Sequence, residues 1–135
     1  MNTIDTMKLA RGLALCAGAM DAATGVGLVA KPGWTLAAMG VATPGAEALV
    51  FLRWVGAFVG AVGVSYLVAL ARGGAPRLRA LFEFTILFRV AAGGYCAVAV
   101  LAGTLEARWI IVALTDCALA VAQLWLLGRR DWSHA

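Results

Sequence analysis

The chain has 135 residues, of which 63% are hydrophobic and only 13% are charged, and its mean hydropathy is +0.90. Soluble domains carry about 25% charged residues, so this composition excludes an ordinary soluble domain and indicates a protein embedded in a lipid bilayer. The net charge of +4 comes from basic residues scattered between apolar runs. This scatter argues against nucleic acid as a partner, because a nucleic-acid site clusters basic residues on one face.

Four long apolar runs dominate the chain, at residues 12–30, 47–71, 81–103 and 109–127. A helix needs about 20 apolar residues to cross a bilayer, so each run predicts a membrane-spanning helix. The first run could also be read as a secretory signal peptide, but the apolar stretch before its small-residue pattern Ala17-Gly18-Ala19 is short, and we interpret it as a retained span. We therefore expect an all-α, membrane-embedded four-helix bundle that forms a single domain over residues 1–135.

A short apolar segment at residues 34–41 lies between the first two spans and is bracketed by Pro32-Gly33 and Pro44-Gly45. Proline lacks a backbone donor and therefore interrupts helices. The segment is too short to cross a bilayer. It predicts a half-helix that is either re-entrant or lies in the interface, and the sequence leaves both alternatives open.

The basic residues predict the orientation of the bundle. Four spans place both termini on one side, and the termini together with the loop at 72–79 hold most of the basic residues, whereas the opposite side has Lys31 and Arg108. Because such an excess marks the cytoplasmic side, we expect both termini in the cytoplasm, with the chain in a bacterial cytoplasmic membrane. Trp34, Trp54 and Trp109 would form the outer aromatic belt, and Trp125 and Trp132 the inner one.

Each predicted span contains an ionisable residue, in the order Asp21, Arg53, Arg89 and Asp116. A charge at the centre of a membrane helix costs about 2.5–3.5 kcal/mol, so these side chains should be paired or open onto water. Counted along the helices, Asp21 and Arg89 lie at a central depth, and Arg53 and Asp116 lie at an outer depth. The depths predict two ion pairs, Asp21–Arg89 and Arg53–Asp116, whose charges sum to zero.

Small residues share a helix face with each of these charges, which predicts that the charged faces point inward and that the helices approach closely. The larger side chains of the spans, such as Leu52, Val59, Ile86 and Leu126, would then mostly face lipid. Other polar side chains could line the same interior. The candidate ligand-binding or polar network comprises Asp21, Thr24, Arg53, Tyr66, Arg89, Asp116 and Gln123.

The inventory of metal-ligating residues is small. Cys16, Cys96 and Cys117 fall in separate spans without short spacing, which argues against a disulfide framework or a zinc site. The single histidine, His134, stands next to the last residue, so we expect no haem or histidine-ligated metal within the membrane. A bound lipid or quinone is the cofactor that the sequence allows.

The glycine and proline pattern of the first half resembles a known family. The residues are Gly25, Gly27-Leu28, Pro32 and Met39-Gly40, followed by Leu52-Arg53-Trp54-Val55-Gly56, Gly63 and Tyr66-Leu67. In this pattern the chain resembles the small four-helix membrane proteins grouped around DoxX. The resemblance implies a four-helix bundle that is sometimes attached to membrane oxidoreductases or quinone-linked complexes, and it implies no catalytic role for the intramembrane charges. The second half of the chain matches no pattern of that family.

Three classes of function remain open. The small size and the lack of a nucleophile–base or metal-ligand set favour a protein that binds a lipid, quinone or similar amphiphile, or an accessory subunit of a larger membrane complex. The first alternative is a proton-coupled transporter or channel that uses Asp21 and Asp116. Four spans make only a narrow pathway, so that alternative predicts a homo-oligomer. The second is a membrane enzyme in which a carboxylate donates a proton to a lipophilic substrate.

Overall fold

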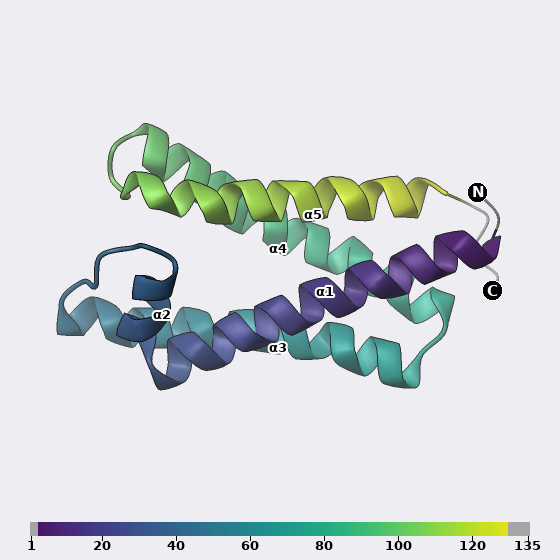
Figure 1. Cartoon of the computed structure of the whole chain (residues 1–135). Coiled ribbons are helices and arrows are strands. Elements are labelled where there is room, and N and C mark those ends of the chain that lie inside the picture. The colour runs from purple at the N-terminus through teal and green to yellow at the C-terminus, as the bar shows by residue number, and fades with distance from the viewer. Residues whose placement is uncertain (1–2, 130–135) are drawn as a thin grey trace.

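The computed structural model describes residues 3–129, and within that range every regular element is a helix (Figure 1). Each of four helical segments is long and apolar enough to cross a bilayer. This confirms the predicted all-α bundle, and the chain is a multi-pass membrane protein. The helices are α1 (Thr3–Ala30), α2 (Pro32–Ala38), α3 (Ala46–Arg72), α4 (Ala75–Leu101) and α5 (Ile110–Gly128), with a 3-10 turn, η1 (Ala107–Trp109), before α5.

The helices α1, α3 and α4 are longer than the apolar runs from which they were predicted, whereas α5 has the predicted length. The helix α1 begins at Thr3 instead of near residue 12, and α4 begins at Ala75 instead of near residue 81. In α1 and α4 the hydropathy of the sequence marks only the apolar part of the helix, and residues of the same helix precede it. In α4 the second residue is Pro76, which suits the first turn of a helix because its nitrogen needs no acceptor there.

The half-helix predicted at residues 34–41 is present as the seven-residue α2, but at Pro32–Ala38, so Pro32 begins this helix instead of preceding it. It ends because Gly40 takes a left-handed conformation with a φ of 72°. The N–H of Val41 then donates to the carbonyl of Leu36 over 2.9 Å, as in a Schellman cap. Leu36 is fully buried whereas Trp34 is 71% exposed, so one side of α2 packs on the bundle and the other faces outward.

The long helices form two pairs, α1 with α3 and α4 with α5, and most of the contact between helices lies within each pair (Figure 1). The start of α1, the end of α5 and the α3–α4 connection lie together at one end of the bundle, which we call the terminal end. The helix α2 and the α4–α5 connection lie at the opposite end, which we call the α2 end.

Glycines bring α1 and α3 into backbone contact. A Cβ atom added to Gly25 would collide with the backbone of Gly60, and one added to Gly63 would collide with the backbone of Ala22. Such close approach lets van der Waals contacts hold membrane helices together where no hydrophobic drive exists. The predicted close packing of small residues is therefore confirmed for this pair.

Contacts at both ends hold the two pairs together. At the terminal end, the side chains of Tyr66, Phe82 and Leu126 are buried in one apolar cluster that joins α1, α3, α4 and α5. At the α2 end, the N–H of Ala42 donates to the carboxylate of Glu106 over 3.1 Å, which ties the α2–α3 connection to the α4–α5 connection. The two pairs are therefore in contact at both the terminal end and the α2 end.

Two of the side chains predicted to face lipid are instead buried. Leu126 is 2% exposed and Ile86 is 9% exposed, whereas Leu52 and Val59 are partly exposed. Leu126 lies in the terminal-end cluster, where the two pairs converge and need large apolar side chains to fill the space between them. The expectation was wrong because it assigned the interior to small residues throughout, whereas backbones collide with an added Cβ mainly at the α1–α3 contact.

Candidate functional site

One arginine joins three of the spanning helices. Arg89 of α4 donates from Nη2 to Oδ2 of Asp21 on α1 over 2.8 Å, and from Nη1 to Oδ1 of Asp116 on α5 over 2.7 Å. The Arg89 side chain is 4% exposed, and those of Asp21 and Asp116 are 12% and 15% exposed. Charge-assisted hydrogen bonds of this kind are about twice as strong as neutral ones, so this triad connects the α1–α3 pair to the α4–α5 pair.

The triad confirms one predicted ion pair and contradicts the other. Asp21 binds Arg89 as expected, but Asp116 also binds Arg89, and Arg53 is exposed on α3. Ten residues separate Arg53 from Gly63, which at about 100° per residue turns Arg53 about 80° away from the glycine face. The prediction matched the heights of Arg53 and Asp116 but not their directions around the helix axes.

A second polar layer adjoins the triad on the side of the terminal end. The hydroxyl of Tyr66 on α3 donates to Oγ1 of Thr85 on α4 over 2.7 Å, and the side-chain amide of Gln123 on α5 donates to the Tyr66 hydroxyl. Thr85 donates in turn to the carbonyl of Leu81 over 2.8 Å. Tyr66 and Gln123 are fully buried and Thr85 is 3% exposed. Every one of the four spanning helices therefore contributes a side chain to the triad or to this layer.

The sequence identified most of these side chains but missed Thr85. Thr85 lies one helical turn before Arg89, so its position on the same face of the span was the signal that could have found it. The two layers are in contact, because the guanidinium carbon of Arg89 lies 5.7 Å from the centroid of the Tyr66 ring, within cation–π range. Thr24, the remaining candidate, is half-buried on α1 and belongs to neither layer.

The polar interior is not balanced in charge or in hydrogen bonds. Two carboxylates share one guanidinium, so the fully ionised triad carries one excess negative charge, where the sequence predicted a sum of zero. Among the residues that the structure describes, Nε of Arg89 and Oε1 of Gln123 are buried without a hydrogen-bond partner. A buried polar group usually finds a partner. The interior therefore retains one donor, one acceptor and one negative charge with which a proton or a ligand could interact.

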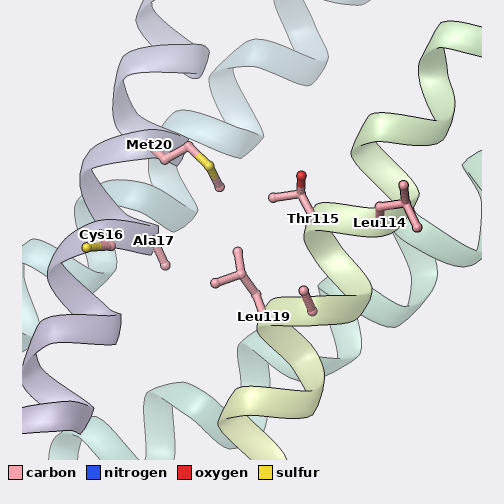
Figure 2. Close-up of a pocket in the computed structure, with 7 residues that line it drawn as sticks. Cys16, Ala17, Met20, Leu114, Thr115 and Leu119 are labelled. Carbon is pink, nitrogen blue, oxygen red and sulfur yellow. The ribbon is translucent and has the colours of Figure 1, made fainter.

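An apolar groove of about 420 Å³ lies between α1 and α5, where the two helix pairs face each other (Figure 2). Two of its residues, Met20 and Thr115, directly precede the triad carboxylates Asp21 and Asp116 in the chain, so the groove lies at the height of the triad. Met20 is 40% exposed and Leu114 is 65% exposed, so the groove opens sideways toward the surrounding lipid. Its full lining is Cys16, Ala17, Met20, Leu114, Thr115, Ala118 and Leu119.

In the part of the chain that the structure describes, the possible metal ligands are dispersed. Within residues 3–129, no group of three or more histidine, cysteine, aspartate or glutamate side chains is arranged to hold a metal ion. Cys16, Cys96 and Cys117 are free thiols. His134, on which the expectation about haem depended, lies outside the described residues, as does Trp132.

No known family profile, curated protein or solved structure matches this chain. The resemblance to the DoxX group therefore stays a prediction.

Proposed function

We propose that the protein binds an amphiphile, such as a lipid or a quinone-type molecule, with the apolar part of the ligand in the α1–α5 groove and its polar head beside the triad. The observation that carries the proposal is the groove itself, which opens sideways and lies at the height of Asp21 and Asp116. Ligand sites are commonly apolar clefts of about 300–1,000 Å³ with a few convergent polar groups, and this groove falls within that range.

The charge of the triad favours one kind of head group. Each carboxylate gives only one oxygen to Arg89 in the bonds described above, and the pair exceeds the guanidinium by one negative charge. Carboxylates accept hydrogen bonds and donate none when ionised. A head group that carries hydroxyl or amine donors, such as a quinol, therefore fits this site better than one that offers only carbonyl acceptors.

The test compares two neighbouring substitutions on α5. Ala118→Trp would fill the groove, whereas Cys117→Trp adds the same side chain at an adjacent exposed position outside it. Both variants and the unaltered protein would be purified in detergent or nanodiscs, and bound molecules would be identified by native mass spectrometry and organic extraction. We expect the unaltered protein and Cys117→Trp to retain an amphiphile that Ala118→Trp has lost.

The same experiment can contradict the proposal. Equal retention of the amphiphile in both variants would mean that it binds outside the groove. No amphiphile in the unaltered protein would mean that the protein does not bind one. Recovery of a second protein in stoichiometric amount would instead favour an accessory subunit of a membrane complex.

The excess carboxylate favours a second candidate, proton-coupled transport. An aspartate without a full counter-charge inside a membrane can take up and release a proton, and Asp116 has the more exposed carboxylate of the two. This candidate predicts that Asp116→Asn abolishes flux driven by a pH gradient in proteoliposomes while the helical circular dichroism is unchanged. Flux that persists in this variant, or none in the unaltered protein, would exclude it.

We further infer that the terminal end faces the cytoplasm. Lys8, Arg11, Arg72 and Arg77 are exposed there, and basic residues are retained on the cytoplasmic side of membrane proteins. Reporter fusions to each terminus and to the α4–α5 connection would test the orientation. Activity of a cytoplasmic reporter at the termini and of a periplasmic reporter at the connection is the expected pattern.

A further inference from the structure

A second groove, between α3 and α4, lies on a different side of the bundle from the proposed amphiphile site. It measures about 600 Å³, and its apolar wall includes Val64 and Val68 of α3 and Leu81 and Phe84 of α4. The lining also contains one charged residue, Arg77, in the first turn of α4. The groove therefore runs along the membrane-spanning part of the bundle and has a guanidinium at its terminal end.

The position of Arg77 is fixed by the α3–α4 connection. Its Nη1 donates to the carbonyl of Arg72 over 2.9 Å. The side chain also lies against Gly73, where an added Cβ atom would be 2.7 Å from Cδ of Arg77. These contacts hold the guanidinium at the mouth of the groove, although the side chain as a whole is exposed. Its remaining nitrogens are therefore available to an anion.

The surroundings of Arg77 are strongly basic. The segment from Arg72 to Arg79 contains three arginines and no acidic residue, and Arg72 is exposed beside Arg77. Arg79 is already engaged, because it donates to the carbonyls of Leu127 over 3.0 Å and Arg129 over 3.2 Å. The helix α4 also begins here with Gly74 as its N-cap and no side-chain cap, so its positive dipole end adds to the basic charge.

We propose that this groove binds an anionic phospholipid, with one acyl chain along the apolar wall and the phosphate held by Arg77 and Arg72. Basic sites at the membrane surface between spanning helices recognise anionic head groups, and arginine matches phosphate with paired hydrogen bonds. The apolar wall distinguishes the occupant from a free phosphate, which the arginines alone would attract. The site is independent of the α1–α5 groove, so either proposal can fail without the other.

The first experiment measures binding of phosphatidylglycerol and of phosphatidylcholine with the same acyl chains by native mass spectrometry, at equal mole fraction. We expect phosphatidylglycerol to bind more tightly to the unaltered protein. Arg77→Gln and Arg72→Gln should each weaken its binding about fivefold, since one basic residue near an anionic surface contributes about a factor of five. The control is Arg53→Gln. It removes an exposed arginine from α3, the helix that carries Arg72, at a position that does not line the groove.

A second pair of variants tests the apolar wall. Ala61 lines the groove and Ala57, one helical turn earlier, does not, although both are exposed on α3. Ala61→Trp should displace the lipid and Ala57→Trp should leave it bound.

Three results would overturn the proposal. These are equal binding of the two lipids, unchanged phosphatidylglycerol binding in Arg77→Gln, and unchanged binding in Ala61→Trp. A fourth contrary result is displacement of phosphatidylglycerol by inorganic phosphate as effectively as by added lipid, which would show that the arginines bind the anion alone.

Discussion

The α1–α3 interface and the interface between the two helix pairs are held together by different kinds of contact. Within the α1–α3 pair, Gly25, Gly60 and Gly63 let two backbones touch, and no side chain is needed. Between the pairs, Arg89 reaches across to Asp21 while also binding Asp116 of its own pair, and Tyr66 and Gln123 add hydrogen bonds. In this protein, backbone packing holds the closely spaced helices α1 and α3 together, and hydrogen bonds between polar side chains join the more widely spaced helix pairs. The first interface should be sensitive to added volume, and the second to lost charge.

The largest expected effect is the loss of the shared guanidinium. Arg89→Leu leaves Asp21 and Asp116 buried without a counter-charge, and breaking a buried ion pair from one side costs about 3–5 kcal/mol. We expect a loss of that size in the free energy of unfolding, measured by denaturation in detergent micelles. Adding Asp21→Asn and Asp116→Asn to this variant should recover most of the loss. A stable single variant would mean that the triad does not hold the pairs together.

Added volume at the other interface should have the next largest effect. Gly63→Ala places a methyl group against the backbone of Ala22, and overpacking of this kind costs about 1–3 kcal/mol. Gly94→Ala on α4 is the matched control, because an added Cβ meets no atom within 4 Å there. The same denaturation measurement should show a loss for Gly63→Ala and none for Gly94→Ala. Equal stability of both variants would contradict the backbone contact.

A smaller effect is expected in the second polar layer. Tyr66→Phe removes the hydroxyl that donates to Thr85 and accepts from Gln123, and one intramolecular hydrogen bond contributes about 0.5–1.5 kcal/mol. Tyr95→Phe is its control, because Tyr95 is 69% exposed. Thermal unfolding followed by circular dichroism should detect the first change only. A similar shift of the unfolding temperature in both variants would mean that the loss of any tyrosine hydroxyl has this effect, and would contradict a specific role of the buried layer.

The smallest effect belongs to the arginine outside both interfaces. Arg53→Gln should change the free energy of unfolding by less than about 0.5 kcal/mol, the range typical of surface substitutions. The result distinguishes an Asp116 that is paired with Arg89 from one that is paired with Arg53. A loss comparable to that of Arg89→Leu would restore the Arg53–Asp116 pair that the sequence suggested and the structure contradicts.

The spans, the half-helix and the Asp21–Arg89 pair could be predicted because each depends on quantities that the chain carries locally. Hydropathy locates the apolar part of each span, Pro32-Gly33 and Pro44-Gly45 bracket the half-helix, and residue counting gives the depth of a charge. Depth alone sufficed for Asp21 and Arg89, since both also lie on inward faces.

The remaining features depend on which helices are neighbours, and no local pattern contains that information. Arg53 has a depth similar to that of Asp116 but points away from it, and Arg89 can serve two carboxylates only because α4 lies within reach of both α1 and α5. The burial of Ile86 and Leu126 follows from the same arrangement, because the space between the two pairs is wider than the space within α1–α3.

The α1–α5 groove opens sideways between two membrane-spanning helices, at the height of the buried triad. An occupant of the proposed amphiphile site would therefore arrive by lateral diffusion in the plane of the bilayer. Its effective concentration is then a mole fraction relative to the surrounding lipid or detergent. Dissociation constants expressed per litre would drift with the amount of detergent, and saturation curves at two detergent-to-protein ratios should superimpose only when plotted against mole fraction.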